Sequence, residues 1–236
     1  MNPITVVRRV EARLVPFRWT WAEENRAAIA ANWERRRAAT PAIFNGRVLM
    51  VCGLDHEDDV LRASFFATDY ADMLAHIDGG NPDPSVENGF AMGALRSGDG
   101  AFILGEMAAG TANAGRLYFP AGTPDMSDVG ADGSVDLESS ILRELAEETG
   151  LGSELVRMQP DWVLVRFERR VAVMRDLDLA VDATSALKAI RAHIAGEDDP
   201  ELADVVALRD PGDIEEARMP SFLPLYLRWA FEADQR

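Results

Sequence analysis

The order of apolar and polar positions divides the chain into a helix-containing first part and a strand-rich second part. Alternating apolar and polar residues predict strands, whereas apolar residues three or four positions apart predict helices. In the first part we expect strands over 4–15 and 48–54 and helices over 21–39 and 68–77. The acidic residues 55–59 are expected to form a solvated loop, and the turn-rich residues 79–84 end this part.

Strands dominate after residue 84. We expect strands over 90–96, 101–107, 116–120, 161–170, 171–176 and 205–208, and helices over 139–149, 184–196 and 221–233. The sequence leaves open whether the strands 161–170 and 171–176 are continuous. Strands interspersed with helices are typical of a layered α/β or α+β domain. We therefore divide the chain into an N-terminal α+β extension, residues 1–84, and a core domain, residues 85–236.

Charge and composition narrow the classes of function. The 236 residues include 40 Asp and Glu against 24 Lys and Arg, and the net charge of −16 argues against a nucleic-acid or anionic-membrane partner. A phosphate ligand stays compatible, because a metal ion can reverse the local charge. Residues 1–14 lack the apolar segment of a signal peptide, so we expect a cytoplasmic protein. The single cysteine, Cys52, lies in an apolar run and is expected to be buried.

The expected helix over 139–149 carries the most chemistry. Asp136 is a suitable N-cap, and Gly150 suits the left-handed residue that often ends a helix. An apolar stripe on this helix is expected to anchor it on a sheet, and it consists of Ile141, Leu142 and Leu145.

Three glutamates of this helix, Glu144, Glu147 and Glu148, stand at i, i+3 and i+4 and therefore share one face. Like charges at this spacing destabilise a helix by ~0.2–0.5 kcal/mol per pair. A divalent cation removes that repulsion, and Mg²⁺ prefers hard oxygen ligands. The plainer interpretation is a solvated acidic face on which Arg143 and Glu147 form an ordinary ion pair.

A calcium-binding loop is a second interpretation of the preceding acidic segment. Four oxygen-bearing or glycine positions of an EF-hand loop are matched in spacing, by Asp125, Ser127, Gly130 and Asp136. Val129 at position 5 has no side-chain oxygen, and the segment before the loop is predicted to be strand and turn. We therefore reject the EF-hand interpretation.

Residues 143–151, Arg-Glu-Leu-Ala-Glu-Glu-Thr-Gly-Leu, resemble the C-terminal part of the Nudix box, Arg-Glu-apolar-x-Glu-Glu-x-Gly-apolar, at all seven specified positions. Residues 118–122, Tyr-Phe-Pro-Ala-Gly, are similar to the strand and turn that enter the box. The resemblance implies a Nudix-type α/β/α sandwich with a mixed sheet. It also implies a pyrophosphohydrolase that uses Mg²⁺ or Mn²⁺ to hydrolyse a nucleoside diphosphate linked to another moiety.

The first half of the box departs from the family pattern. Counted from Gly122, the acidic position falls on Asp128, and fourteen residues then precede Arg143 instead of seven. Counted from Gly130, it falls on Asp136, with only six residues before Arg143. In both alignments Asp replaces Glu. We favour Gly122 and Asp128, because Gly122 follows the expected strand, and we interpret part of residues 125–135 as an inserted loop.

A looser resemblance points to the UDP-sugar diphosphatase branch of the same family. That branch has a Gly-x-Pro-acid turn and a long loop before its catalytic helix, as residues 122–125 do here. The N-terminal residues that match are Ala28, Trp33, Glu34, Arg36, Pro41, Ile43, Phe44, Asn45, Gly46, Phe66, Thr68, Asp69 and Tyr70. This similarity implies a nucleotide-sugar substrate of the UDP-glucose or UDP-galactose type.

The resemblance also implies roles for individual residues. Glu144, Glu147 and Glu148 are expected to hold the metal ions, with a further ligand from the backbone of Gly122. Glu144 is alternatively the group that orients or deprotonates the attacking water, and Arg143 is expected to pair with a box carboxylate. Some branches add a downstream base or ligand, for which we favour Glu201 among the candidates Glu168, Glu201, Glu215 and Glu216.

Substrate contacts and assembly are less constrained. Aromatic residues able to stack on a base, or to pack in the core, are Trp19, Trp21, Phe90, Tyr118, Phe119 and Trp162. The expected partner is a small-molecule nucleotide, and the oligomeric state is open, a homodimer included. Alternative functions are a non-catalytic Nudix-fold ligand sensor or binding module, a Nudix hydrolase of ADP-ribose or another nucleotide, and a scaffold domain with an acidic helix.

Overall fold

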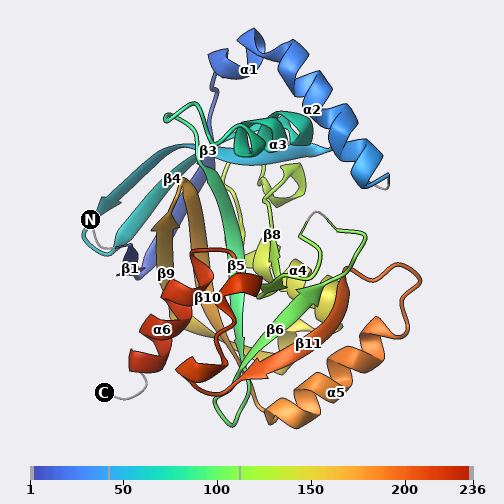
Figure 1. Ribbon diagram of the computed structural model, residues 1–236. Helices are drawn as coiled ribbons and strands as arrows, with labels where there is room; N and C mark the ends of the chain where they lie inside the picture. The colour runs from blue at the N-terminus through green and yellow to red at the C-terminus, as the bar shows by residue number, and fades with distance from the viewer. Residues whose placement is uncertain (1–2, 42, 112, 234–236) are drawn as a thin grey trace.

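The computed structural model describes residues 3–41, 43–111 and 113–233, which form two sheets and six α-helices (Figure 1). The larger sheet has the strand order β1-β9-β10-β5-β6-β11. Its strands are β1 (Ile4–Val7), β5 (Asn88–Arg96), β6 (Phe102–Met107), β9 (Val156–Phe167), β10 (Arg170–Leu179) and β11 (Leu202–Leu208). Strands β5 and β10 pair in parallel and the other pairs are antiparallel, so the sheet is mixed.

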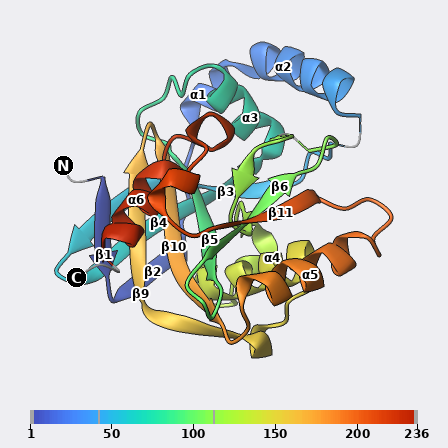
Figure 2. The same ribbon diagram turned by 60° about the horizontal axis from the view of Figure 1, so that its bottom comes forward.

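Both faces of the large sheet are covered by helices. Alternate residues of β5 face opposite sides, so that Ala91 and Leu95 join one buried cluster while Met92 and Ala94 join another. The first cluster includes residues of α4 (Leu137–Thr149) and α5 (Ala183–Ile194), and the second includes α6 (Leu223–Ala233). Figures 1 and 2 show α6 on one side of the sheet and α4 and α5 on the other. The expected α/β/α sandwich with a mixed sheet is confirmed.

The large sheet opens between β5 and β6. These two strands pair only where Arg96 lies opposite Phe102. Beyond that point two short strands fill the gap, β8 (Ala121–Gly122) against β5 and β7 (Leu117–Tyr118) against β6. The opening therefore places the backbone of β8 beside the C-terminal half of α4.

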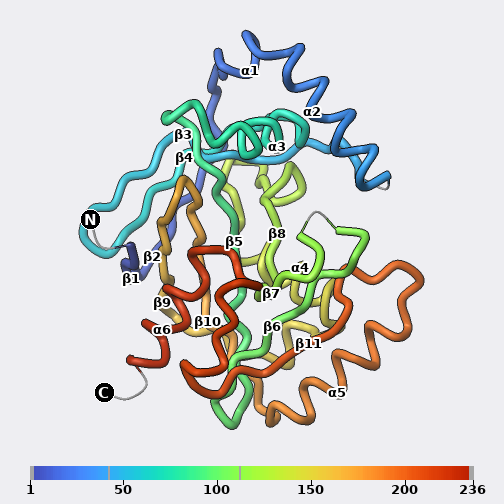
Figure 3. Tube along the Cα trace, in the orientation of Figure 1, coloured from blue at the N-terminus to red at the C-terminus, as the bar shows by residue number. Residues whose placement is uncertain are grey.

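The N-terminal part of the chain forms the smaller sheet, with the order β2-β4-β3. Its strands are β2 (Arg9–Leu14), β3 (Arg47–Glu57) and β4 (Val60–Asp69). One face packs on α1 (Thr20–Glu24), α2 (Arg26–Ala39) and α3 (Tyr70–Asp78), while residues of the other face, such as Phe65, belong to the main core cluster. The tube in Figure 3 follows this layer of helices at the top of the molecule.

Several residues of the N-terminal motif hold α3 in place. Asn45 Oδ1 accepts a hydrogen bond of 2.8 Å from the Ala71 N–H, and the Gly46 carbonyl accepts one of 2.8 Å from the Tyr70 N–H. Both contacts satisfy N–H groups that the first turn of a helix leaves without partners. The motif thus fixes the start of α3 and the position of Tyr70.

Some sequence expectations for the first part are wrong. The expected strand over 4–15 is two strands in different sheets, separated at Arg8, because the Arg8 and Arg9 N–H groups bond to the Asp59 carbonyl. The expected helix over 21–39 is divided at Asn25 into α1 and α2. Residues 55–59 are exposed as expected but do not form a loop, because β3 continues to Glu57 and turns at Asp58, φ 52°, into β4, which the sequence did not predict.

In the second part the differences are smaller. Strands β9 and β10 form an antiparallel hairpin, because Glu168 and Arg169 adopt positive φ values of 49° and 65°, so a continuous strand is excluded. The strand expected over 116–120 is limited to Leu117–Tyr118. Cys52 is only half-buried, and its Sγ donates to the Ser64 carbonyl at 3.5 Å. Burial raises the pKa of this thiol.

The division into residues 1–84 and 85–236 stays a prediction, and its outermost residues, 1–2 and 234–236, lie outside the described part. Strand β1 belongs to the large sheet through its pairing with β9. Among the described residues, every helix is too short or too polar to cross a membrane.

Candidate active site

Helix α4, which carries the three glutamates, is held by an N-cap, a C-terminal glycine and buried apolar residues. Asp136 caps its first turn by accepting from the Ser139 N–H at 3.0 Å, and Gly150 ends it with φ of 69°. Ile141 and Leu145 are fully buried against the sheet. Glu148, three residues after Leu145, continues this buried face toward β8 in the opening between β5 and β6.

The three glutamates of α4 are not equivalent. Glu148 is buried, with 6% of its surface exposed, and the side chain of Glu144 is 14% exposed. The side chain of Glu147 is 63% exposed and approaches Arg143 at 3.7 Å. The structure therefore brings Glu144 and Glu148 to the interior edge of the site and directs Glu147 to solvent.

The short strand β8 lies directly against these carboxylates. Glu148 Oε1 accepts from the Ala121 N–H at 3.4 Å. A Cβ atom added to Gly122 would lie 2.2 Å from Glu144 Oε1, closer than real Cβ contacts allow. A glycine at residue 122 is therefore required for the position of the Glu144 carboxylate.

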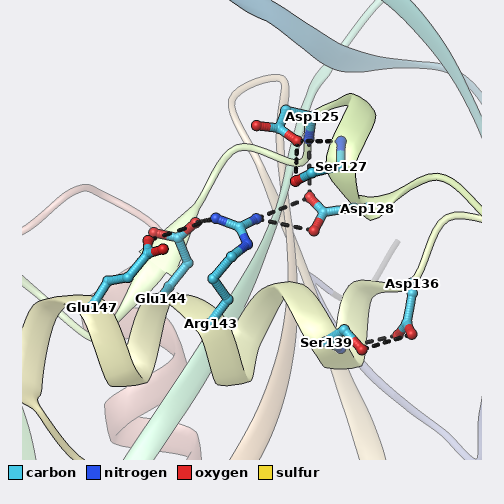
Figure 4. Close-up of polar contacts among 8 residues, drawn as sticks. All are labelled: Asp125, Ser127, Asp128, Asp136, Ser139, Arg143, Glu144 and Glu147. Atoms are coloured by element: carbon cyan, nitrogen blue, oxygen red, sulfur yellow. Dashed lines mark hydrogen bonds and ion pairs between the residues drawn. The ribbon is translucent and has the colours of Figure 1, made fainter.

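Arg143 connects α4 to the loop that precedes it. Its Nη2 donates to Asp128 Oδ1 at 3.0 Å and Oδ2 at 3.2 Å, and its Nη1 donates to Glu144 Oε1 at 2.7 Å. Asp128 in turn accepts from the Asp125 N–H at 3.0 Å at the start of a short 3₁₀ helix, Met126–Asp128. Figure 4 shows the Arg143 guanidinium between Asp128 and Glu144, with Asp136 at the far end of the helix on Ser139. Of the two candidates for the acidic position of the box, Arg143 thus contacts Asp128 and not Asp136.

Burial and mutual repulsion disfavour ionisation of the site. Burial raises the pKa of Glu144 to about 7, although the adjacent Arg143 opposes the change. Burial also raises the pKa of Glu148 well above its ordinary value, and the charges of Glu144 and Glu201 raise it further. Partial loss of hydration and the charge of Glu147 raise the pKa of Glu201. These carboxylates therefore form one electrostatically coupled group.

Glu201 reaches this group from a different element. It immediately precedes β11, and its carbonyl accepts from the Ala108 N–H at 2.8 Å. The other downstream candidates are engaged elsewhere. Glu168 accepts from the Ser221 hydroxyl, and Glu215 and Glu216 pair with arginines, namely Arg218 and Arg228.

The donor chemistry of the site fits a hard divalent cation. Burial disfavours the ionised form of these carboxylates unless a positive charge lies nearby. Carboxylate oxygens are also the ligands that Mg²⁺ and Mn²⁺ prefer. Among the described residues, no three His, Cys, Asp or Glu side chains already stand close enough to hold an ion. Mg²⁺ usually completes its shell with water and substrate phosphate oxygens and binds through one or two carboxylates, as Glu144 and Glu148 could supply.

A cavity of about 200 Å³ extends from Glu148 away from α4. Three of the aromatic residues singled out in the sequence line it, namely Phe90, Tyr118 and Phe119. The tryptophans do not: Trp19 and Trp21 pack on His76, and Trp162 lies under Arg175. Two polar lining residues, Asn88 and Arg170, were not predicted, because they start adjacent strands that no local pattern places together.

No family model and no curated protein matches the chain. Among solved structures, a Nudix hydrolase from M. smegmatis, RenU, is 14% identical with a TM-score of 0.41 over 62% of this chain and 84% of that one. A MutT protein from Methanosarcina mazei Go1 is 16% identical with a TM-score of 0.39 over 63% and 94%. The complex of the C-terminal domain of mouse MUTYH with human PCNA matches with 13% identity and a TM-score of 0.36, over 63% and 88%. The assignment of an α/β/α sandwich therefore rests on the strand order and layers of this chain and not on these similarities.

Proposed function

We propose that this protein is a metal-dependent hydrolase of a nucleoside diphosphate linked to another moiety. The observation that carries the proposal is the pair of largely buried carboxylates, Glu144 and Glu148, held against the backbone of β8 at one end of a cavity. Glu144, Glu147, Glu148 and the backbone of Gly122 would hold Mg²⁺ or Mn²⁺. When bound, the ion neutralises phosphate charge and favours ionisation of a nearby water.

Residues of the chain would then position the carboxylates, accept a proton from water and exclude bulk solvent. Arg143 fixes the direction of Glu144 and ties α4 to Asp128, so it is a positioning residue. Glu144 lies where it can accept a proton from a water molecule, and Glu201 is a second candidate base because its carboxylate acts electrostatically on both Glu144 and Glu148. The apolar wall of the cavity excludes bulk water from one side of the site.

A nucleotide sugar of the UDP-glucose or UDP-galactose type is the substrate that we favour. Two residues of the N-terminal motif, Arg36 and Tyr70, line the cavity beside Glu148. The Gly-x-Pro-acid turn is also ordered against the small sheet, since the Pro124 carbonyl accepts from the Leu49 N–H at 2.7 Å. Residues of the motif that resembles the UDP-sugar branch thus line the cavity in which we propose that the substrate binds, and this supports the choice.

The test is a phosphate-release screen, coupled to a phosphatase, with Mg²⁺ and with Mn²⁺. Its substrates are UDP-glucose, UDP-galactose, ADP-ribose, dinucleoside polyphosphates, coenzyme A and NADH. We expect metal-dependent hydrolysis, with a UDP-sugar among the better substrates. Turnover of ADP-ribose a hundredfold faster than of any UDP-sugar would contradict the finer proposal. Binding of nucleotides without turnover of any of them would favour the alternative, a non-catalytic ligand sensor.

A further inference from the structure

The floor of the cavity is one face of strand β5. Asn88, Phe90 and Met92 alternate along this strand, and all three line the cavity. The neighbouring residues of the strand face the other way: a Cβ on Gly89 would meet Val51, and one on Gly93 would meet Ile141 and Leu177. The floor therefore runs from Met92, opposite Ala121 of β8 near Glu148, to Asn88 at the other end, a length of ~13 Å at 3.3 Å per residue.

Polar groups at the far end of this floor lack partners among the described residues. Asn88 Oδ1 is buried and accepts no hydrogen bond in the part of the chain that the structure describes. An unsatisfied buried acceptor costs about 1–3 kcal/mol, and a turn of the amide toward the cavity would let a ligand donor remove that cost.

Arg170 stands beside Asn88. The two residues are opposite each other in the parallel pair β5–β10, so their side chains share a face, and Arg170 also lines the cavity. Within the described ranges its guanidinium forms no ion pair and no side-chain hydrogen bond, and its charge acts on Tyr118. The other arginine of the lining, Arg36, differs because it is engaged with Asp78. Among the described residues, one amide oxygen and one guanidinium at the same place thus lack a protein partner.

Size and lining identify the kind of group that fits. A cavity of 150 Å³ accommodates benzene, so about 200 Å³ suits a single planar ring system rather than a whole nucleotide. The walls combine aromatic rings, those of Phe90, Tyr118 and Phe222 among them, with polar side chains. A planar heterocycle can stack on these rings while its polar edge hydrogen-bonds to the polar side chains.

We infer that this cavity binds the nucleobase of the substrate, with Asn88 hydrogen-bonding to the edge of the base and Arg170 contacting its face. The inference rests on the proposed function, which puts the diphosphate at Glu144 and Glu148. An Asn amide offers one acceptor and two donors, which complement the adjacent donor and acceptor on a base edge. An arginine plane stacks on bases and on aromatic rings.

The test measures equilibrium binding of nucleosides by isothermal titration in EDTA, so that neither metal nor hydrolysis contributes. The ligands are uridine, cytidine, adenosine and guanosine, with ribose and glucose as ligands that lack a base. We expect at least one nucleoside to bind tenfold more tightly than either sugar. Asn88→Leu and Arg170→Gln should each raise the Kd of that nucleoside by about tenfold. Arg13→Gln, at an exposed arginine outside the cavity, should leave its Kd within twofold.

Two further readouts separate the possible outcomes. Thermal unfolding of each variant checks the fold, and Asn88→Asp, which keeps the size but removes the donor, supplies a second variant if Asn88→Leu does not fold. Equal binding of sugars and nucleosides, or nucleoside binding unchanged in folded Asn88 and Arg170 variants, overturns the inference even if hydrolysis is found. Nucleoside binding that depends on Asn88, without hydrolysis of any nucleotide, contradicts the proposed function and supports the inference.

Discussion

Arg143 contacts both carboxylate oxygens of Asp128, fifteen residues earlier in the chain, at 3.0 and 3.2 Å. The Asp128 side chain is 3% exposed, so this ion pair satisfies a charge that water cannot reach. The same guanidinium contacts Glu144. A single arginine therefore sets the position of the preceding loop and the direction of a carboxylate in the candidate active site.

We expect Arg143→Gln to lower both stability and activity. It leaves the Asp128 carboxylate buried without its cation, which should reduce the free energy of unfolding by about 1–3 kcal/mol. It also releases Glu144, so kcat should fall by at least tenfold with the best substrate of the screen. Urea unfolding and steady-state kinetics measure the two effects.

Asp136→Ala serves as the control for this prediction. It removes the N-cap of α4 but no contact of Arg143, so the loss should be about 1 kcal/mol of stability with little change in kcat. If Asp136→Ala reduced kcat as much as Asp128→Ala, the choice of Asp128 as the box acid would be wrong.

Gly122→Ala should displace the Glu144 carboxylate without unfolding the protein. The added methyl group would lie 2.2 Å from Glu144 Oε1, and this side chain has to move, while the backbone of Gly122 is not in the left-handed region. We expect a fall of at least tenfold in kcat/KM with a change in Tm of a few degrees. The matched variant is Gly110→Ala, where a Cβ meets nothing within 4 Å, and its kinetics should equal those of the wild type. Unchanged kinetics in both variants would show that Glu144 does not depend on this contact.

His76 should make stability depend on pH. It is fully buried beside Trp19 and Trp21, and burial lowers its pKa below the ordinary 6.5, although the nearby Asp83 opposes the shift. Below pH 6.5 the unfolded chain therefore binds a proton that the folded chain does not. The free energy of unfolding should fall with decreasing pH between 6.5 and the lower folded pKa, by at most ~1.4 kcal/mol per pH unit.

His76→Gln should reduce this slope, whereas His56→Gln, at an exposed histidine, should not. Urea unfolding between pH 5.5 and 8, followed by tryptophan fluorescence, measures the difference. Equal slopes in the wild type and His76→Gln would exclude His76 as the source.

The helix of the site could be predicted from the sequence because its determinants are local. The Asp136 cap, the apolar stripe and Gly150 all lie within sixteen residues, and α4 begins and ends within two residues of its expected bounds. Glu144 and Glu148 share a face for the same reason. That Glu147 points to solvent could not be predicted, because helical periodicity gives the direction of a side chain but not what covers it.

The missed features depend on contacts between distant segments. β4 contains the exposed Arg62 among apolar residues and was not predicted, although it pairs with both β2 and β3. The break at Arg8 arises because β1 pairs with β9 in the large sheet whereas β2 pairs with β4 in the small sheet. The alternation of apolar and polar residues gives no sign of this division. Asn88 and Arg170 meet only through the parallel pairing of β5 with β10.

The most direct test of a metal-dependent hydrolase is the hydrolysis rate of Glu148→Gln at limiting Mg²⁺, with the best substrate of the screen. The substitution keeps the side-chain length but removes a charge from the buried carboxylate pair, so the rate should fall on the order of 10²–10⁴-fold. The unfolding temperature without metal should be unchanged or slightly higher, because the substitution removes a carboxyl whose ionisation is disfavoured by burial and by Glu144. Glu138 lies on the same helix and pairs with Arg175 of β10, and Glu138→Gln should turn over at the wild-type rate. A rate for Glu148→Gln within twofold of wild type, or an equal loss in Glu138→Gln, would contradict the assignment.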